Sequence, residues 1–278
     1  MRISAKTKVC IIIGDPVDHS LSPAMHNAAY ESLGIDDQFV YLGANVHVEN
    51  VKKVVEAMRV MKIRGLTCTI PHKIEVLKYL DEIDEVAKKI GAVNTVVNEN
   101  GKLTGYNTDW IGAVMPLEKN TSLKNKKVAI IGAGGASRAI VYGLVLKKAH
   151  VTIFNLTKEK AEKISKEFNC RGTGLEDLRD LKNFDIIINS TSAGMKPQEK
   201  ISLVDPKLLS KDHIVFDIVY TPYETVLLKE AKKRGAKIVH GYQMLLYQGT
   251  AQFKLYTNKK APEEVMEKIL LDNLGVAS

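Results

Sequence analysis

Residues 128–144 read VAIIGAGGASRAIVYGL and join an apolar run to a helical pattern through a glycine-rich turn. An apolar run of this length is typical of a buried strand. Gly132 and Gly134 follow it directly, and Ser137 is the third small residue of the pattern. Such glycines let the backbone approach a pyrophosphate at the positively polarised start of a helix. The stretch predicts a dinucleotide-binding turn; the alternative is a tight strand-to-helix turn without a ligand.

Strand-like runs continue on both sides of this turn. Downstream lie the near-continuous apolar runs HVTIFN, FDIIINSTSAGM, HIVFDIVY and AKIVHG, which are expected of a parallel sheet buried on both faces. Upstream, KVCIIIG, QFVYLGANV and GLTCTI alternate with helical patterns, which indicates a second sheet covered by helices. The polar linker EKNTSLKNKK separates the two series. We therefore predict an α/β fold of two domains, a number that also suits the 278-residue length.

Composition narrows the functional class. The net charge of +8 comes from 40 Lys and Arg against 32 Asp and Glu, scattered through helical stretches such as KEKAEKISKEF. Basic residues scattered in this way do not indicate nucleic-acid binding. The net positive field would still attract an anionic substrate or cofactor. Cys10, Cys68 and Cys170 are odd in number and widely spaced, which favours neither disulfides nor a metal site. No stretch predicts a signal peptide or a membrane span, so we expect a cytoplasmic protein.

The segment HSLSPAMHN, residues 19–27, has two readings. Ser22 can cap a helix, Pro23 suits the first helical position, and Gly34 can end the helix. Ser20 lies outside that role and can project into the space beside the helix start. The serines therefore mark either a helix start alone or hydroxyls that meet a polyhydroxylated substrate.

Two further segments carry candidate chemistry. Asn100 and Gly101 form a strong two-residue hairpin signal, and pairing about this turn sets Asn94 opposite Asn107, with Asp109 close by. In TIPHKIEVLKYL a helix starting near Pro71 would place Lys73 in its first turn. The positive end of the helix dipole destabilises a cation in this turn by a few tenths to about 1 kcal/mol. The same field helps a lysine to give and take a proton near neutral pH. The alternative is an ordinary solvated lysine.

The strand after the glycine-rich helix bears on the choice of cofactor. In an NAD site this strand normally ends with an acidic residue, about 20 residues beyond the glycines. Here the strand ends TIFNLTKEK, with Asn155 at its tip and no acid before Glu159. Lys158 and Lys160 would meet a 2′-phosphate with positive charge, so the residues favour NADP, and NAD stays possible.

Several stretches, in this order and at these separations, resemble the shikimate dehydrogenases of aromatic amino-acid biosynthesis: GDPVDHSLSPAMHN, TIPHK, GAVNT with GYNTD, GAGGASRA, DIVYTPYET and HGYQMLLYQGTAQF. The resemblance covers nearly the whole chain. It implies reversible NADPH-dependent reduction of 3-dehydroshikimate to shikimate. It also implies a catalytic domain with a mostly parallel sheet, residues 1–115 plus 243–278, and a Rossmann NADP-binding domain, residues 116–242.

The resemblance also implies residue roles. Lys73 would be the acid/base, paired with Asp109. The implied substrate-binding residues are Ser20, Ser22, Thr69, Lys73, Asn94, Asp109, Tyr220 and Gln248. The implied cofactor-binding residues are Glu85, Gly132, Ala133, Gly134, Gly135, Ala136, Asn155, Leu156, Thr157, Lys158, Lys160, Ile218 and Gly241. No metal is implied.

Three positions depart from the family pattern. Thr67 and Cys68 stand where the family usually has Asn-Val, Leu156 stands where it usually has the arginine that clasps the 2′-phosphate, and Trp110 is bulkier than expected. Substrate breadth and cofactor choice therefore stay open. The alternatives are a quinate/shikimate dehydrogenase that uses NAD, and a non-catalytic sensor of NADP or shikimate. A monomer or a homodimer fits either.

Overall fold

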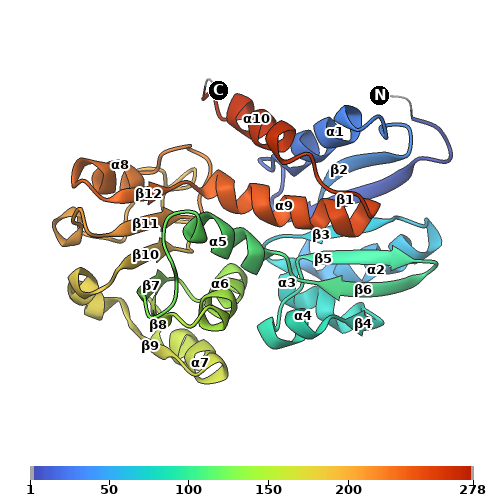
Figure 1. Cartoon of the computed structure of the whole chain (residues 1–278). Helices are drawn as coiled ribbons and strands as arrows, with labels where there is room; N and C mark the ends of the chain where they lie inside the picture. The colour runs from blue at the N-terminus through green and yellow to red at the C-terminus, as the bar shows by residue number, and fades with distance from the viewer. Residues whose placement is uncertain (1–2, 277–278) are drawn as a thin grey trace. The chain divides into compact units, whose positions relative to one another are not determined.

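The computed structural model describes residues 3–276 and divides into two compact units. The first takes in the chain up to Asp109 and again from Leu246, and the second runs Trp110–Leu245 (Figure 1). The domain limits predicted from the sequence, 115/116 and 242/243, stay a prediction. The helix α9 (Gly241–Thr257) contains the second division between the units.

The first unit contains a mixed six-stranded sheet in the order β2-β1-β3-β5-β6-β4. Every strand except β5 runs in the same direction, which confirms the predicted mostly parallel sheet. Its strands are β1 (Lys8–Gly14), β2 (Phe39–Asn45), β3 (Gly65–Cys68), β4 (Glu82–Ile83), β5 (Thr95–Glu99) and β6 (Lys102–Tyr106). Its helices are α1 (Ser22–Ser32), α2 (Val51–Val60), α3 (His72–Glu75), α4 (Glu85–Ile90) and α10 (Glu263–Asn273), with 3-10 turns η1 (Val48–Asn50) and η2 (Val76–Tyr79).

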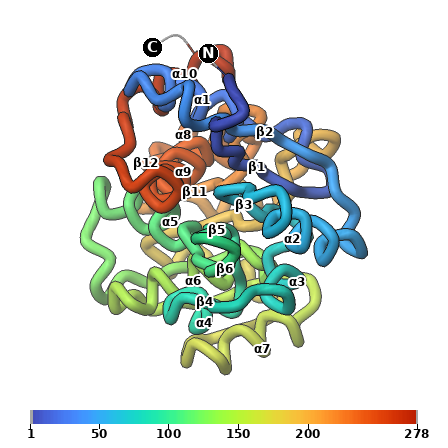
Figure 2. Tube along the Cα trace, turned by 90° about the vertical axis from the view of Figure 1, so that its right-hand side faces the viewer, coloured from blue at the N-terminus to red at the C-terminus, as the bar shows by residue number. Residues whose placement is uncertain are grey.

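Alternation along β3 shows how this sheet is covered. Leu66 and Cys68 point into the apolar core that α2 closes, whereas the Thr67 hydroxyl bonds Tyr41 and Tyr256, the latter on α9. Successive side chains of a strand point to opposite faces, so α2 and α9 cover opposite faces of the sheet. Helices α1 and α10 pack side by side (Figures 1 and 2).

The strand register gathers several loops at one edge of this sheet. Ile13 of β1 pairs with Cys68 of β3, and Thr95 pairs with both Thr67 and Tyr106. The carboxyl ends of β1, β3 and β6 therefore meet where β5 begins. Ligands of open α/β sheets bind at such edges, and the segments after Gly14, Cys68 and Tyr106 carry the predicted substrate residues.

The second unit contains an all-parallel six-stranded sheet in the order β12-β11-β10-β7-β8-β9, the strand order of the doubly wound dinucleotide-binding fold. Its strands are β7 (Lys127–Ile131), β8 (His150–Asn155), β9 (Arg171–Gly174), β10 (Ile186–Asn189), β11 (Ile214–Asp217) and β12 (Lys237–Val239). Its helices are α6 (Gly135–Leu146), α7 (Lys158–Phe168) and α8 (Val226–Lys233), with 3-10 turns η3 (Leu175–Asn183) and η4 (Pro206–Leu208); α5 (Asp109–Glu118) leads into it.

Both faces of this second sheet are buried. Ile130 and Ile188 belong to one apolar cluster, and their neighbours Ile131 and Ile187 belong to another. Because neighbouring residues of a strand point to opposite faces, this confirms the prediction drawn from the near-continuous apolar runs.

The start of α1 differs from its prediction. Leu21 is the N-cap and makes no side-chain cap bond, so the predicted capping role of Ser22 is wrong. The Ser20 hydroxyl instead accepts a hydrogen bond from the Ser22 N–H at 3.3 Å. Ser20 therefore takes part in the helix start, which the sequence did not predict. Gly34 follows the helix at φ 62°, as predicted for its end.

Gly241 opens α9 in close contact with backbone. A Cβ added there would lie 2.4 Å from the Val219 carbonyl oxygen and 2.6 Å from that of Ile218. Gly241→Ala is therefore expected to destabilise the protein by about 1–3 kcal/mol and to lower Tm by several degrees, measured by thermal melting. Gly43→Ala is the matched control, since its nearest neighbour would lie at 3.7 Å. Equal melting of the two variants would contradict the prediction.

Asp217 is fully buried, and burial raises the pKa of its carboxyl from 3.8 to about 6, against hydrogen bonds from Thr225, Val219 and Asn189. Between these values the folded state holds a proton that the unfolded chain releases. Stability therefore falls as pH rises through this window, by about 3 kcal/mol. Asp217→Asn removes this titration. Urea unfolding from pH 4 to 7 is expected to show that the free energy of unfolding of the variant rises relative to that of the wild type across this window. A constant difference between the two proteins would contradict the prediction.

Candidate active site

Lys73 and Asp109 form a nearly buried ion pair. The Nζ–Oδ2 distance is 2.5 Å, and the side chains are 13% and 6% exposed. The helix starts where the sequence predicts, since Pro71 is the N-cap of α3 and Lys73 lies in its first turn. The helix is short, because α3 ends at Glu75 and continues as the 3-10 turn η2. A single helical turn carries little macrodipole, so the carboxylate, rather than a helix terminus, sets the electrostatic environment of Lys73. The Lys73 carbonyl also accepts the Val93 N–H at 2.8 Å, which fixes the backbone.

Asn94 joins this pair as the hairpin register predicted. Asn100 and Gly101 adopt φ 54° and 93° at the turn, and the Asn94 Nδ2 donates to Asp109 Oδ1 at 2.9 Å. The predicted convergence of Asn94 and Asp109 is confirmed. Asn107 serves the backbone instead, since its amide oxygen accepts the Asp109 N–H at 3.0 Å.

The helix α9 adds glutamines to the same network. The Asn94 Nδ2 approaches Gln248 Oε1 at 3.4 Å. Gln252, one turn on, donates to the Thr95 hydroxyl at 2.9 Å. Sequence reasoning named Gln248 and missed Thr95 and Gln252. The available signal was the i, i+4 spacing of two glutamines in a helix that is otherwise largely apolar on that side.

Three other predicted substrate residues lie near the same sheet edge, whereas Tyr220 follows β11 in the second unit. Ser22 is buried, and Ser20 and Thr69 are half-buried. The Thr69 N–H donates to the Ile13 carbonyl at 3.0 Å, which ties the end of β3 to β1. Their contact with a substrate stays a prediction.

Two of the departures from the family pattern have structural explanations. The Thr67 hydroxyl lies in the core between Tyr41 OH at 2.6 Å and Tyr256 OH at 2.8 Å. It therefore belongs to a buried core network. Trp110 packs edge-on against Tyr142 in the second unit, with ring centroids 6.0 Å apart, so its bulk contributes to apolar packing there.

The glycine-rich turn assigns its glycines different roles. Gly132 adopts φ +119°, and a Cβ there would lie 2.6 Å from Ser190 Oγ, so the turn itself requires glycine. A Cβ on Gly134 would meet nothing within 4 Å. Its surface is open to a ligand at the start of α6, where the helix presents backbone N–H groups.

Ser137, the third small residue, ties this turn together from inside. The Gly134 N–H donates to Ser137 Oγ at 3.1 Å, and Ser137 Oγ lies 2.7 Å from Ser190 Oγ. The Ser190 hydroxyl donates to the Ile131 carbonyl at 2.8 Å. These bonds fix the turn in a shape suited to a phosphate.

The loop between β8 and α7 is open and basic. Asn155 Nδ2 donates to the Thr157 carbonyl at 2.9 Å, and Leu156 is 85% exposed. Lys158 and Lys160 lie in the first turn of α7. The loop thus offers cations and an exposed apolar side chain where the resemblance expects an arginine.

The remaining predicted cofactor residues are dispersed. Glu85 opens α4 and pairs with Lys88 at 2.7 Å, which lowers the pKa of the Glu85 carboxyl. Ile218 follows the end of β11, and Gly241 opens α9. Ala133, Gly135 and Ala136 belong to the glycine-rich turn and the first residues of α6. Cofactor contact by these residues stays a prediction.

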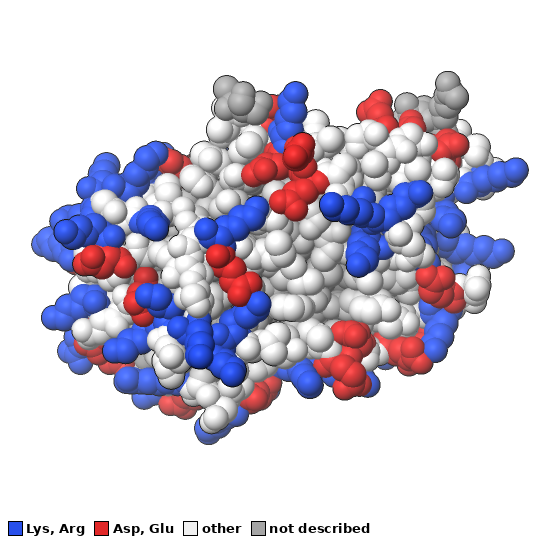
Figure 3. All heavy atoms as spheres, in the orientation of Figure 1, with Lys and Arg blue, Asp and Glu red and all other residues white. Residues whose placement is uncertain are grey.

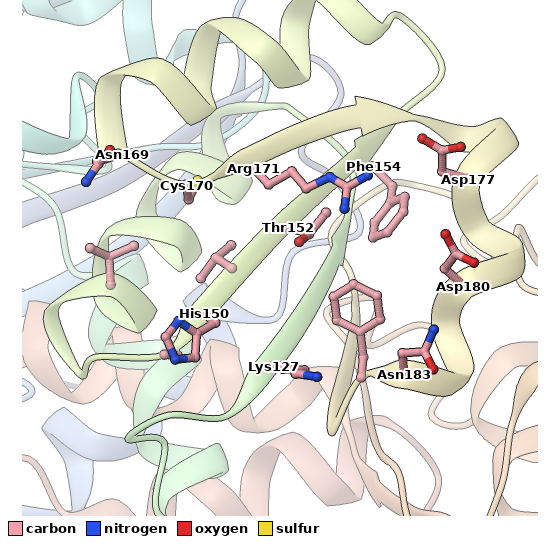
Figure 4. Close-up of a pocket in the computed structure, with 14 residues that line it drawn as sticks. Lys127, His150, Thr152, Phe154, Asn169, Cys170, Arg171, Asp177, Asp180 and Asn183 are labelled. Carbon is pink, nitrogen blue, oxygen red and sulfur yellow. The ribbon is translucent and has the colours of Figure 1, made fainter.

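The second unit also contains a separate cavity, whose lining residues are shown in Figure 4. Its lining includes the first residues of three strands, which are Lys127 of β7, His150 of β8 and Arg171 of β9. The glycine-rich turn follows the opposite, carboxyl end of β7. None of the predicted site residues lines the cavity, so it is not the predicted nucleotide site.

Other site types find no support within residues 3–276. This part of the chain holds no group of three or more His, Cys, Asp or Glu side chains placed to bind a metal. It also contains no helix of the length and apolarity that a membrane crossing needs. Burial raises the pKa of the Cys10 and Cys68 thiols to about 12. On the face shown in Figure 3, basic side chains are spread among acidic ones.

Comparison with known proteins addresses the family. The model of the shikimate dehydrogenase substrate binding domain matches residues 12–96. That of shikimate / quinate 5-dehydrogenase matches residues 116–220, and that of the shikimate 5′-dehydrogenase C-terminal domain matches residues 241–271.

Individual relatives match along nearly their whole length. A shikimate dehydrogenase (NADP(+)) from Methanococcus maripaludis strain C7 is 49% identical, over 96% of this chain and 98% of the relative. A shikimate dehydrogenase solved in complex with NADP+ superimposes with TM-score 0.91 at 45% identity, over 98% of this chain and 97% of the other. Shikimate 5-dehydrogenase from Listeria monocytogenes, solved in complex with shikimate and NAD, superimposes with TM-score 0.88 at 37% identity, over 97% of this chain and 98% of the other. The chain belongs to the shikimate dehydrogenase family.

Proposed function

We propose that this protein is an NADP-dependent shikimate dehydrogenase that interconverts shikimate and 3-dehydroshikimate. The observation that carries the proposal is the nearly buried Lys73–Asp109 pair, bonded to Asn94. Taking two charges out of water is costly. A binding protein without chemistry has little need of such a pair, which disfavours the sensor alternative.

In ketone reduction Lys73 donates a proton to the carbonyl oxygen as hydride reaches the carbon, and in oxidation it takes the proton back. Asp109 holds the ammonium group in place through its Oδ2, while Asn94 binds its other oxygen. A bound nicotinamide cofactor supplies or accepts the hydride. The remaining proposed substrate contacts are Ser20 and Ser22 for the carboxylate, with Thr69, Asn94, Tyr220 and Gln248 for hydroxyls and pocket shape.

The turn residues Gly132 and Gly134 fit a dinucleotide, because the open surface of Gly134 leaves room for a pyrophosphate at the start of α6. The loop from Asn155 to Lys160 receives the adenosine 2′-phosphate, with Lys158 and Lys160 as point charges. Support for NADP comes from the relatives, whose names and complexes include it.

A four-way assay tests this function: purified protein with shikimate or quinate, each with NADP or NAD, followed by nicotinamide absorbance. We expect shikimate with NADP to give the highest kcat/KM. Absence of shikimate oxidation with both cofactors in folded protein would overturn the proposal. Comparable turnover of quinate with NAD would favour the second candidate, a quinate/shikimate dehydrogenase, which the exposed Leu156 supports.

The free cysteines Cys10, Cys68 and Cys170 suit a reducing compartment, which supports the proposal of a cytoplasmic enzyme. Its oligomeric state, monomer or homodimer, is proposed without preference.

A further inference from the structure

Gln252 lies on α9 behind the candidate catalytic residues and is fully buried. Its Nε2 donates to Thr95 Oγ1 at 2.9 Å and approaches the Asn94 carbonyl oxygen at 3.5 Å. A carbonyl oxygen only accepts hydrogen bonds. This neighbour therefore favours the amide orientation in which Nε2, and not Oε1, faces Thr95.

The orientation of Gln252 determines where the Thr95 hydroxyl sends its single hydrogen. Because the hydroxyl oxygen accepts the Gln252 N–H, its own hydrogen is directed to another acceptor. That acceptor is Asn94 Oδ1, at 2.8 Å. The same oxygen also accepts the Thr108 N–H at 2.8 Å.

Two donors on Asn94 Oδ1 fix the side-chain amide of Asn94 with Nδ2 toward Asp109. Nδ2 then donates to Asp109 Oδ1 at 2.9 Å, which leaves Oδ2 for Lys73 at 2.5 Å. A flipped Asn94 amide would place its oxygen against the carboxylate, acceptor against acceptor. The order of donors thus runs from Gln252 through Thr95 and Asn94 to the ion pair.

The far end of Gln252 meets a neutral group. His26 on α1 is fully buried and stacks on Tyr41 with ring centroids 4.3 Å apart. Burial lowers the pKa of His26 to about 3, and the neighbouring Gln252 amide offsets this shift only in part. His26 is therefore uncharged at neutral pH. Within residues 3–276, neither ring nitrogen of His26 nor the Gln252 Oε1 has a hydrogen-bond partner of good geometry.

We propose that Gln252 is a positioning residue for the Lys73–Asp109 pair and acts through Thr95 and Asn94. The inference rests on the proposed function, in which that pair transfers the proton. It predicts that the direction of the hydrogen bond between Gln252 and Thr95, rather than its mere presence, controls kcat.

Gln252→Glu tests this direction with almost no change in shape. A carboxylate only accepts, so it takes the Thr95 hydrogen away from Asn94 Oδ1. We expect kcat to fall about tenfold, the effect of one hydrogen bond of ordinary upper strength, while the KM for NADP stays unchanged. Gln252→Met, which removes the bond without reversing it, is expected to lower kcat by only about threefold.

Double variants separate positioning from a general loss of stability. In a Thr95→Val background no hydroxyl can be redirected, so adding Gln252→Glu is expected to cause no further fall in kcat. In a Thr95→Ser background the tenfold fall is expected to return. Thr257→Val is the matched control. Its buried hydroxyl lies on the same helix and, within residues 3–276, bonds only the Phe253 carbonyl and the Lys259 N–H.

Wild-type kcat in Gln252→Glu, or an equal fall with and without the Thr95 hydroxyl, would overturn the inference. A crystal structure of the Gln252→Glu variant gives a readout that needs no activity. Loss of the Asn94–Asp109 bond would support positioning, and an unchanged bond would overturn it. Failure of the proposed function shows separately, as a wild-type protein that does not oxidise shikimate.

Discussion

Replacing Lys73 with methionine is expected to lower kcat for shikimate oxidation by about 10²- to 10⁴-fold, the usual effect of losing a positioned acid/base. Methionine keeps most of the side-chain volume and supplies no proton. Asp109, 6% exposed, then keeps Asn94 as a donor and loses its cation. Steady-state kinetics measure kcat, and fluorescence titration is expected to show nearly unchanged NADP affinity, which also verifies that the variant is folded.

The matched control is Lys78→Met, five residues along the chain. Lys78 is 64% exposed and pairs with Glu75 on the surface, so its replacement is expected to leave kcat near wild type. Near-normal turnover of Lys73→Met would refute the proton-transfer role of this lysine.

Leu156→Arg is expected to raise the kcat/KM ratio for NADP over NAD by about 10- to 100-fold. A charge-assisted hydrogen bond to the 2′-phosphate stabilises its complex by about 1.5–3 kcal/mol, which corresponds to that change in affinity. Leu156 is 85% exposed, so an arginine fits without repacking. The gain is expected mainly as tighter NADP binding, and the wild type is expected to favour NADP already.

Leu156→Gln is the control for this substitution, because it adds a long polar side chain without charge and is expected to leave the ratio nearly unchanged. Kinetics with each cofactor decide the matter. A wild-type ratio below one, or no rise with arginine, would show that the loop from Asn155 to Lys160 does not contact the 2′-position.

The sequence predicted the sheets better than the helix ends. Buried parallel strands read as continuous apolar runs, and the Asn100-Gly101 turn fixes the register that brings Asn94 to Asp109. The helix start near Pro71 was predicted correctly, but its apolar spacing did not reveal the change to a 3-10 turn after Glu75. Ser22 was misassigned as a cap because serine and proline at a helix start fit more than one register.

Long-range partners account for what the sequence could not provide. Thr95 and Gln252 are 157 positions apart, and neither carries a local pattern that names the other. The Thr67 hydroxyl, at a position where the family usually has asparagine, bonds tyrosines of β2 and α9. Hydroxyls and amides find their partners only when the fold brings distant strands and helices together.

The chain order of the two units has a consequence for synthesis on the ribosome. The second unit is one continuous segment, whereas the first needs residues beyond Leu246 to complete it. The ring of Tyr256 packs over Gly65, and Arg64 Nε donates to the Tyr256 carbonyl at 2.8 Å. These partners emerge only after the whole second unit. One face of the nascent amino-terminal sheet therefore stays uncovered, and the network around Lys73 and Asp109 is completed only when α9 has left the ribosome.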